Sequence, residues 1–139
     1  MAAAGEVIDR LIDLGDAATL RDGGTGIRFD LLAGTEPAIG FVIRHRGAVH
    51  GYLNRCAHVA MELDWQPGEF FDFDREFLIC ATHGALYEPA SGVCAGGPCA
   101  GHGHLQRLDV FERDGRIYWR PDAFARARSG SANRENTVG

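Results

Sequence analysis

Hydrophobic and polar positions exchange over short distances along this chain, in the pattern of short β-strands separated by turns. Four apolar-rich runs predict strands, and they lie at residues 6–14, 27–32, 38–44 and 48–53. The first run also fits a short helix, although we favour a strand. Asp22-Gly23-Gly24-Thr25-Gly26 and Ala33-Gly34 are typical of turns, and His45-Arg46-Gly47 predicts a hairpin. The first half of the chain is therefore expected to be an antiparallel sheet.

The second half continues the pattern. Residues 77–79 predict a short buried strand that leads into Cys80. Residues 105–112 and 116–120 flank Arg113-Asp114-Gly115 and predict another hairpin, because Asp-Gly favours a tight turn. We expect an all-β fold, an antiparallel β-sandwich or small barrel, as a single domain over residues 1–124. Residues 125–139 lack an apolar pattern and are predicted to be a disordered tail.

Composition narrows the class of protein. The 139 residues include 19 Gly and 5 Pro, which fits many turns, and the net charge of −5 argues against a nucleic-acid binder. The start of the chain shows no secretory signal, and no run of about eighteen apolar residues could cross a membrane. A cytoplasmic protein is expected.

Two short motifs carry metal-ligand residues: Cys56-Ala57-His58 and Cys80-Ala81-Thr82-His83. Each supplies one thiolate and one imidazole, and each follows a predicted strand. Such a set can hold one tetrahedral zinc ion. It can also hold a two-iron cluster with two Cys on one iron and two His on the other. The spacing within the motifs does not decide between these metals.

The residues after the second motif resemble the Rieske family. His83 is followed by Gly84, an aromatic Tyr87, a turn ending at Gly92 and then Gly96-Gly97-Pro98. The resemblance covers about residues 10–121 and implies a Rieske-type 2Fe–2S cluster, one per chain. It also implies a Rieske-like fold with an inserted cluster-binding subdomain at about residues 54–100. A zinc-stabilised interaction module becomes a remote alternative.

The resemblance assigns roles by position. Cys56 and Cys80 would ligate the inner iron, and His58 and His83 the outer iron near the surface. Gly84 would allow the backbone to approach the cluster closely. Tyr87 is either a hydrogen-bond donor to a ligand sulfur or a plain core aromatic. A loop that shields the cluster from water would be formed by Gly96, Gly97 and Pro98.

Three positions depart from the respiratory-complex branch of the family. Met61 and Thr82 stand where that branch has a disulfide-forming Cys pair, and Ala85 stands where it has a Ser that donates to a bridging sulfide. Fewer donors near a cluster lower its reduction potential. These departures resemble the soluble Rieske-type ferredoxins of ring-hydroxylating dioxygenase systems, and a potential low in the Rieske range is expected.

The segment between the two motifs is acidic. A solvated polar loop explains it, or a rim that steers a basic partner toward the cluster. The candidate docking residues are Glu62, Asp64, Glu69, Asp72, Asp74 and Glu76.

Two further cysteines, Cys94 and Cys99, flank the Gly-Gly-Pro loop. We expect free thiols, with a local disulfide as the alternative. His102 and His104 follow closely and fit an exposed Gly-rich turn better than a second metal site.

No substrate site or nucleotide-binding loop is recognisable, so a one-electron carrier rather than an enzyme is expected. The partners implied by the resemblance are a flavin-containing reductase and a terminal oxygenase or similar acceptor, served by a monomeric shuttle. The alternative from another class is a small Rieske subunit or redox sensor within a larger oxidoreductase.

Overall fold

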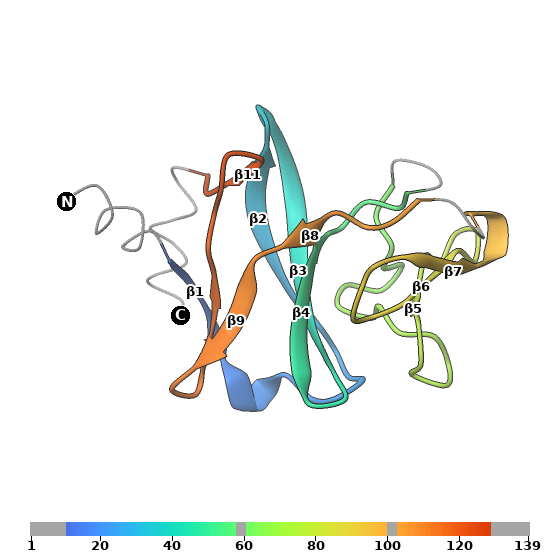
Figure 1. Ribbon diagram of the computed structural model, residues 1–139, viewed down its shortest axis with the longest axis horizontal. Coiled ribbons are helices and arrows are strands. Elements are labelled where there is room, and N and C mark those ends of the chain that lie inside the picture. The colour runs from blue at the N-terminus through green and yellow to red at the C-terminus, as the bar shows by residue number, and fades with distance from the viewer. Residues whose placement is uncertain (1–10, 58–60, 100–102, 129–139) are drawn as a thin grey trace.

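The computed structural model describes residues 11–57, 61–99 and 103–128, which form short strands joined by loops (Figure 1). In chain order the elements are β1 (Ile12–Asp16), η1 (Ala17–Thr19), β2 (Ile27–Ala33), β3 (Glu36–His45), β4 (Ala48–Leu53), β5 (Leu78–Ile79), β6 (Leu86–Tyr87), β7 (Cys94–Gly96), η2 (Gly97–Cys99), β8 (Arg107–Leu108), β9 (Val110–Arg113), β10 (Arg116–Trp119) and β11 (Ala125–Arg126). The predicted all-β fold class is confirmed.

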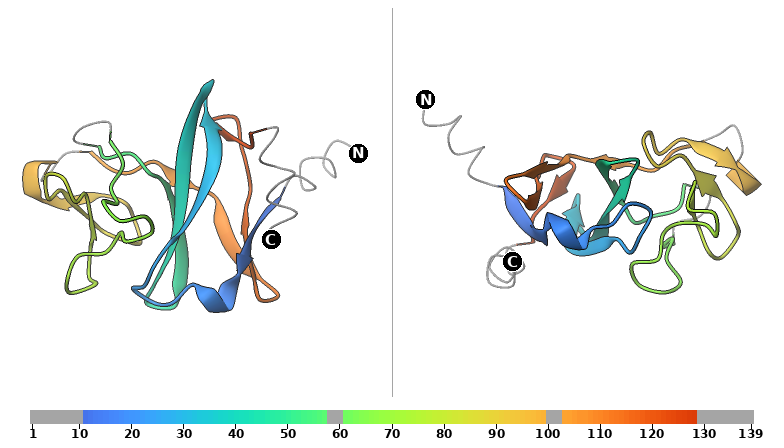
Figure 2. Two further views of the ribbon diagram at one scale, coloured as in Figure 1. Left: turned by 180° about the vertical axis from the view of Figure 1, so that it is seen from behind. Right: turned by 90° about the horizontal axis from the view of Figure 1, so that it is seen from below.

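The strands form three antiparallel sheets, ordered β11-β2-β3-β4-β8, β1-β10-β9 and β5-β6-β7. The first two sheets lie together at one end of the molecule, and the third lies at the other end (Figures 1 and 2). Phe29 of β2 and Trp119 of β10 contact each other between the first two sheets, with ring centroids 4.9 Å apart. We call the buried cluster around them the barrel core.

The hairpin of β3 and β4 buries side chains on both faces. Val42 and Leu53 point into the barrel core. Phe41, Ile43 and Tyr52 instead join a second buried cluster, the site core, which also contains Cys56, Cys80 and Tyr87. This division follows from the alternation of side chains along a strand. The hairpin is therefore a wall shared by the two halves of the molecule.

Both predicted hairpin turns are confirmed. Arg46 and Gly47 join β3 to β4 with φ angles of 52° and 83°, and Asp114 and Gly115 join β9 to β10 with φ angles of 51° and 80°. Two left-handed residues in succession are the geometry of a type I′ turn, whose twist matches that of the strands.

Two predictions about strands need correction. The single strand predicted over residues 105–112 is wrong, because β8 pairs with β4 whereas β9 pairs with β10, so the chain changes sheet at Asp109. The tail predicted from Ala125 is wrong for β11, which pairs with Ala33 and Leu32 of β2. The two residues of β11 are too few to show the alternation of apolar and polar positions by which a strand is predicted. The early strand is found as β1, while residues 6–10 and 129–139 lie outside the described residues.

The third sheet belongs to an excursion of the chain between β4 and β8. Gly51 and Tyr52 of β4 pair with Leu108 and Arg107 of β8, and the Leu53 amide donates to the Gln106 carbonyl at 2.8 Å. These pairings close the base of the segment spanning residues 54–106. Both ligand motifs lie within it, so the barrel holds the site from one side.

Candidate metal centre

The first ligand motif begins directly after β4. The Cys56 amide donates to the Met61 carbonyl at 2.8 Å, which brings the chain back on itself within five residues. Cys56 is 3% exposed, so its sulfur faces the site core rather than water. His58, the predicted imidazole ligand of this motif, lies outside the described residues.

The second ligand motif is a tight turn after β5. The Cys80 amide donates to the Ala85 carbonyl at 2.9 Å, and the Gly84 amide donates back to the Cys80 carbonyl at 2.8 Å. Gly84 closes the turn with a φ of 78°, a left-handed conformation that favours glycine. The turn buries Cys80 completely and leaves Thr82 and His83 exposed.

The two cysteines are brought together. Burial raises the pKa of the Cys80 thiol, and the nearby Cys56 side chain raises it further; the Thr82 and His83 amides, which hydrogen-bond to the sulfur, oppose the shift. Two adjacent buried thiolates are unfavourable without a cation, and a bound metal ion favours deprotonation of its thiol ligands. This sulfur pair suits a metal. Within the described ranges no three His, Cys, Asp or Glu side chains surround a single point.

Asn54 and Asp64 hold the two ligand motifs in place. Asn54 accepts from the Leu63 amide and donates to the Asp64 carboxylate, both at 2.8 Å. The Leu63 carbonyl in turn accepts from the Ala81 amide, one residue after Cys80, at 2.9 Å. Asn54 was not predicted from the sequence. A polar residue directly before a buried cysteine, at the end of a strand, was the available signal.

Tyr87 combines the two roles that the sequence left open. Its ring is fully buried in the site core. Its hydroxyl oxygen lies 3.1 Å from the Cys56 sulfur and accepts a hydrogen bond from the Ala57 amide at 2.9 Å. Because that oxygen accepts from Ala57, its own proton is available for the sulfur.

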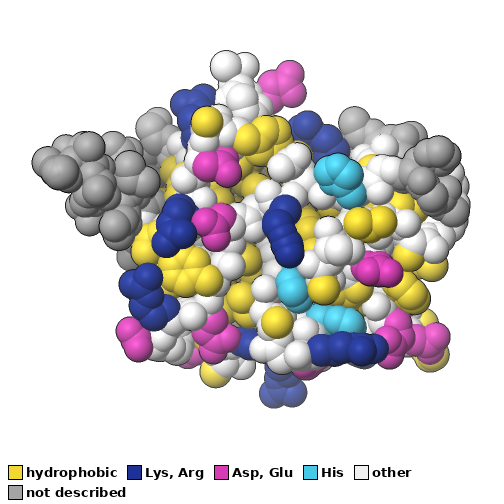
Figure 3. All heavy atoms as spheres, in the orientation of Figure 1, with side chains coloured by type: hydrophobic (Ala, Val, Ile, Leu, Met, Phe, Trp, Pro, Cys, Tyr) yellow, Lys and Arg dark blue, Asp and Glu magenta, His cyan; other side chains and the backbone are white. Residues whose placement is uncertain are grey.

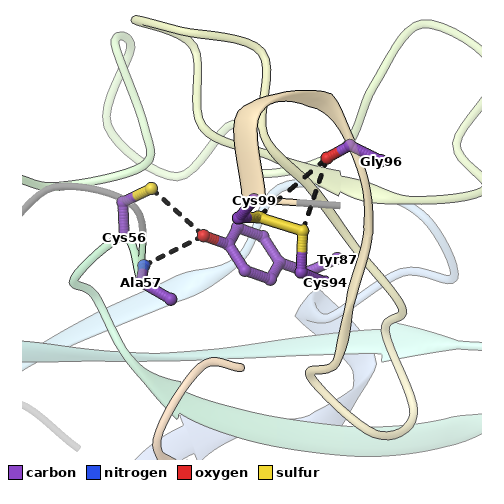
Figure 4. Close-up of a disulfide and its surroundings, with 6 residues drawn as sticks. All are labelled: Cys56, Ala57, Tyr87, Cys94, Gly96 and Cys99. Carbon is purple, nitrogen blue, oxygen red and sulfur yellow. Dashed lines mark hydrogen bonds between the residues drawn. A yellow bond between two sulfur atoms is a disulfide. The ribbon is translucent and has the colours of Figure 1, made fainter. Parts of the chain in front are cut away.

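Cys94 and Cys99 form a disulfide across the Gly96-Gly97-Pro98 loop (Figure 4). The expectation of free thiols is wrong, because β7 and η2 bring the two residues together at the start and end of one short turn. The other two described cysteines, Cys56 and Cys80, take no part in a disulfide. With Cys94 and Cys99 bonded to each other, a second metal site with His104 loses its thiolates, and His102 lies outside the described residues.

The backbone of the loop at Gly97 approaches the backbone of the second ligand motif closely. A Cβ at Gly97 would collide with the Gly84 carbonyl oxygen and would lie 3.0 Å from the Ala85 Cα. A Cβ at Gly84 would meet no atom of the described chain within 4 Å. The loop of Gly96, Gly97 and Pro98, which we call the cover loop, thus packs on the second ligand motif through Gly97. Among the described residues, none fills the space beside the Gly84 Cα.

The acidic side chains between the two motifs differ in exposure. Asp64 is buried, accepts from the Gly68 amide at 2.9 Å and lies 3.4 Å from the Arg28 guanidinium, so its predicted docking role is wrong. Glu62 pairs with Arg28 at 3.1 Å and Glu76 with Arg46 at 3.2 Å.

The other acidic side chains differ in their engagement. Asp72 accepts from the Glu76 and Phe77 amides, and Glu69 accepts from the Thr25 hydroxyl at 2.8 Å. Asp74 is exposed. Along the lower right of Figure 3, acidic and basic side chains stand next to each other.

Comparison with known protein families matches the Rieske [2Fe-2S] domain over residues 17–121. The chain belongs to the Rieske [2Fe–2S] domain family. The cofactor of this domain is a Rieske-type 2Fe–2S cluster. The buried sulfur pair fits this cofactor, since two cysteines hold one of its irons. No curated protein matches the sequence.

Solved structures of Rieske proteins share the fold. A chain of the reduced complex between oxygenase and ferredoxin in carbazole 1,9a-dioxygenase is 17% identical, with a TM-score of 0.65 over 82% of this chain and 30% of that chain. The terminal oxygenase from Novosphingobium sp. KA1 is 18% identical, with a TM-score of 0.64 over 79% of this chain and 29% of that chain. Our chain therefore spans less than a third of these two matches.

A shorter relative matches along almost its whole length. The ferredoxin of carbazole 1,9a-dioxygenase from Nocardioides aromaticivorans IC177 is 18% identical, with a TM-score of 0.61 over 81% of this chain and 98% of that chain. At this identity the likeness establishes the fold.

Proposed function

We propose that the protein is a one-electron carrier of the Rieske ferredoxin type. It would accept an electron from a reductase and pass it to an oxygenase or a similar acceptor. The cluster would be held by Cys56 and Cys80 on one iron and by His58 and His83 on the other.

One observation carries this proposal. The buried Cys56 and Cys80 thiols lie near each other, and the Tyr87 hydroxyl lies 3.1 Å from the Cys56 sulfur. His83, which shares a motif with Cys80, is exposed. A cluster that is buried on its sulfur side and reaches the surface on its imidazole side suits electron exchange with another protein. The match to nearly the full length of a ferredoxin further supports a carrier.

The chain's own residues perform three tasks in this proposal. Cys56 and Cys80 are buried and would bind the cluster with sulfurs that are shielded from water. The exposed His83 ring would offer an edge to a partner protein. Gly97 and the loop around it cover the second motif. The bound cluster would supply the stored electron.

The surroundings of the sulfurs favour a low potential. Ala85 is fully buried and brings no hydroxyl, so Tyr87 is the side-chain donor described beside the ligand sulfurs. Fewer donors stabilise the reduced cluster less. We expect a potential in the lower part of the Rieske range of about −150 to +300 mV.

We propose that partner steering depends on Glu69 and Asp74. Both are exposed, and unlike Glu62 and Glu76 they have no arginine ion pair at close range among the described residues. Exposed like charges raise the rate of encounter with a basic partner and lose this effect at high salt. Electron-transfer rates with a flavin-containing reductase should therefore fall with ionic strength, and less so in Glu69→Gln/Asp74→Asn.

The decisive experiment is to load the protein with iron and sulfide and to count both. A carrier binds about two irons and two sulfides per chain, is red-brown, and is reduced and reoxidised by one electron. Cys56→Ser and Cys80→Ser should abolish loading, whereas Cys94→Ala/Cys99→Ala should retain it. A colourless protein with a single zinc ion would overturn the proposal.

Partner binding separates a shuttle from a fixed subunit. A shuttle is monomeric and is reduced quickly by the reductase without forming a stable complex. Stable, stoichiometric co-purification with an oxidoreductase would instead favour the subunit or sensor.

No helix in the described parts of the chain is long and apolar enough to cross a membrane. The cytoplasmic location stays a prediction, and cell fractionation tests it.

A further inference from the structure

The Cys94–Cys99 disulfide closes a loop that contacts both ligand motifs. Cys94 lies directly opposite Tyr87 in the pairing of β7 with β6. Figure 4 shows the disulfide beside the Tyr87 ring, whose hydroxyl points to Cys56 and Ala57. All three cysteines and Tyr87 belong to the site core. Tyr87 thus lies between the disulfide and the sulfur of Cys56, a proposed cluster ligand.

The second contact runs through the loop itself. Gly97 lies within the disulfide-closed turn and approaches the backbone of Gly84 and Ala85 too closely to admit a Cβ. Gly84 and Ala85 form the turn that positions Cys80. A displacement of the closed loop would therefore reach the second ligand motif as well as the first.

A third contact connects the disulfide to the residue after Cys56. The Cys94 amide donates to the Gly103 carbonyl at 3.1 Å, and a Cβ at Gly103 would lie 3.2 Å from the Ala57 Cβ. Within the closed loop, the Gly96 carbonyl oxygen lies 3.4 Å from the Cys94 sulfur. Neighbours of this disulfide at Tyr87, Gly97 and Gly103 thus lie beside the two ligand motifs.

We propose that the Cys94–Cys99 disulfide is a positioning element of the cluster site. It holds the Tyr87 hydroxyl against the Cys56 sulfur and holds the cover loop on the second motif. Opening the disulfide weakens both the Tyr87 contact and the packing of the loop. The reduction potential of the cluster and its retention therefore depend on whether Cys94 and Cys99 are oxidised, although this disulfide does not take part in the electron transfer. This proposal rests on the proposed cluster function.

The bond is chemically able to respond to thiols. A dithiol can open it by exchange: the dithiol gives up two electrons and two protons and becomes a disulfide, while Cys94 and Cys99 become thiols. Disulfides in reducing compartments are commonly transient or redox-sensing. The cluster, as a one-electron centre, does not itself supply this two-electron reaction.

The test is a cycle of four proteins loaded with iron and sulfide: wild type, Tyr87→Phe, Cys94→Ala/Cys99→Ala, and the triple variant. Reduction potentials are measured by voltammetry. Tyr87→Phe lowers the potential in the wild-type background. In the background without the disulfide, we expect the same substitution to produce less than half of that shift, because Tyr87 is no longer held in place. An equal shift in both backgrounds overturns the proposal.

Cluster retention gives a second readout. Loss of the visible absorbance in EDTA should be about threefold or more faster without the disulfide, because local opening becomes easier. Ile117→Val is the matched control, since it weakens the distant barrel core and should leave the potential unchanged. A potential that moves as much in Ile117→Val would reduce the disulfide to a general stabiliser and contradict the proposal.

The wild-type holoprotein provides a route that does not depend on a variant folding. Dithiothreitol is added in steps, and opened chains are counted as those alkylated at Cys94 and Cys99. Absorbance loss in EDTA should rise in proportion to the opened fraction. Opened chains that retain the cluster as long as closed chains would overturn the proposal. A wild type that binds no iron and sulfide at all would instead overturn the proposed function.

Discussion

The buried carboxylate of Asp64 accepts a hydrogen bond from the Asn54 side-chain amide at 2.8 Å. The same carboxylate accepts from the Gly68 amide and faces Arg28, while the Asn54 oxygen accepts from the Leu63 amide. This small network ties the end of β4 to the segment between the two cysteine motifs. The negative charge of Asp64 is therefore buried and paired within the fold.

Replacing Asp64 should be strongly destabilising. Asp64→Ala leaves buried donors of Asn54 and Gly68 without an acceptor, and Arg28 without its buried partner. We expect a loss of about 3 kcal/mol in the free energy of unfolding, measured by urea denaturation. The exposed Asp74→Ala is the control, with an expected change within about 0.5 kcal/mol. Equal effects would show that Asp64 is not part of the core.

The Tyr87 hydroxyl should tune the proposed cluster. Tyr87→Phe keeps the buried ring and removes the group 3.1 Å from the Cys56 sulfur. A hydrogen bond of about 1 kcal/mol corresponds to about 40 mV for a one-electron couple, so the potential should fall by about that amount. Redox titration of the loaded protein provides the measurement.

Tyr52 supplies the matched control for this substitution. Its ring is equally buried in the site core, but its hydroxyl donates to the Pro89 carbonyl at 2.7 Å. Burial raises the pKa of Tyr52 to about 12, so its hydroxyl stays protonated at neutral pH. Tyr52→Phe should reduce stability and leave the potential unchanged. A potential shift in both variants would show that the effect is general to the site core.

Alanine substitutions at Gly84 and at Gly34 test whether the cluster needs the space beside Gly84. Both adopt left-handed φ angles, 78° and 66°, and a Cβ at either would meet no described atom within 4 Å. In the cluster-free protein each Ala substitution should cost roughly 1 to 2 kcal/mol of backbone strain. In the loaded protein, Gly84→Ala alone should also reduce the iron content. Equal iron content in the two variants would contradict a close approach of the cluster to Gly84.

The hairpin turn between β3 and β4 should make stability depend on pH. Backbone hydrogen bonds from Arg46 and Gly47, at 2.9 and 2.7 Å, hold the pKa of Asp22 below its ordinary value of 3.8. The folded state therefore binds this proton less readily than the unfolded state. The stabilisation is present above the unfolded pKa and is lost as the pH falls through the lower folded value.

Substitution isolates the contribution of this carboxylate. Asp22→Asn should lower the melting temperature at pH 7, and the difference from wild type should shrink steadily as the pH falls below about 4. Thermal unfolding across that range measures it. A difference independent of pH would mean that the charge of Asp22 contributes nothing to the turn.

The features predicted well from the sequence are local ones. Both hairpins follow from a few adjacent residues. The resemblance to the Rieske family gave Tyr87 as a candidate donor to a ligand sulfur, and its hydroxyl lies 3.1 Å from the Cys56 sulfur. Family resemblance was decisive for the identity of the cofactor, because the Cys and His spacing also allowed zinc.

The features that were missed depend on partners distant in sequence. Asp64 looked like one more acidic loop residue, because its burial is set by Arg28 on β2 and by Asn54. The Cys94–Cys99 disulfide depends on the path of the chain through β7 and η2, which a separation of five residues permits without requiring. The two residues of β11 gain their strand character only from pairing with β2.

The two-faced hairpin of β3 and β4 has a consequence for the order of events in biogenesis. The segment that carries the cysteine motifs has only short strands of its own, and its buried side chains pack on Phe41, Ile43 and Tyr52. The hairpin is built from contacts close in sequence and can form early. We expect the segment with the cysteine motifs to pack on this hairpin after the hairpin has formed, so that cofactor insertion follows hairpin formation.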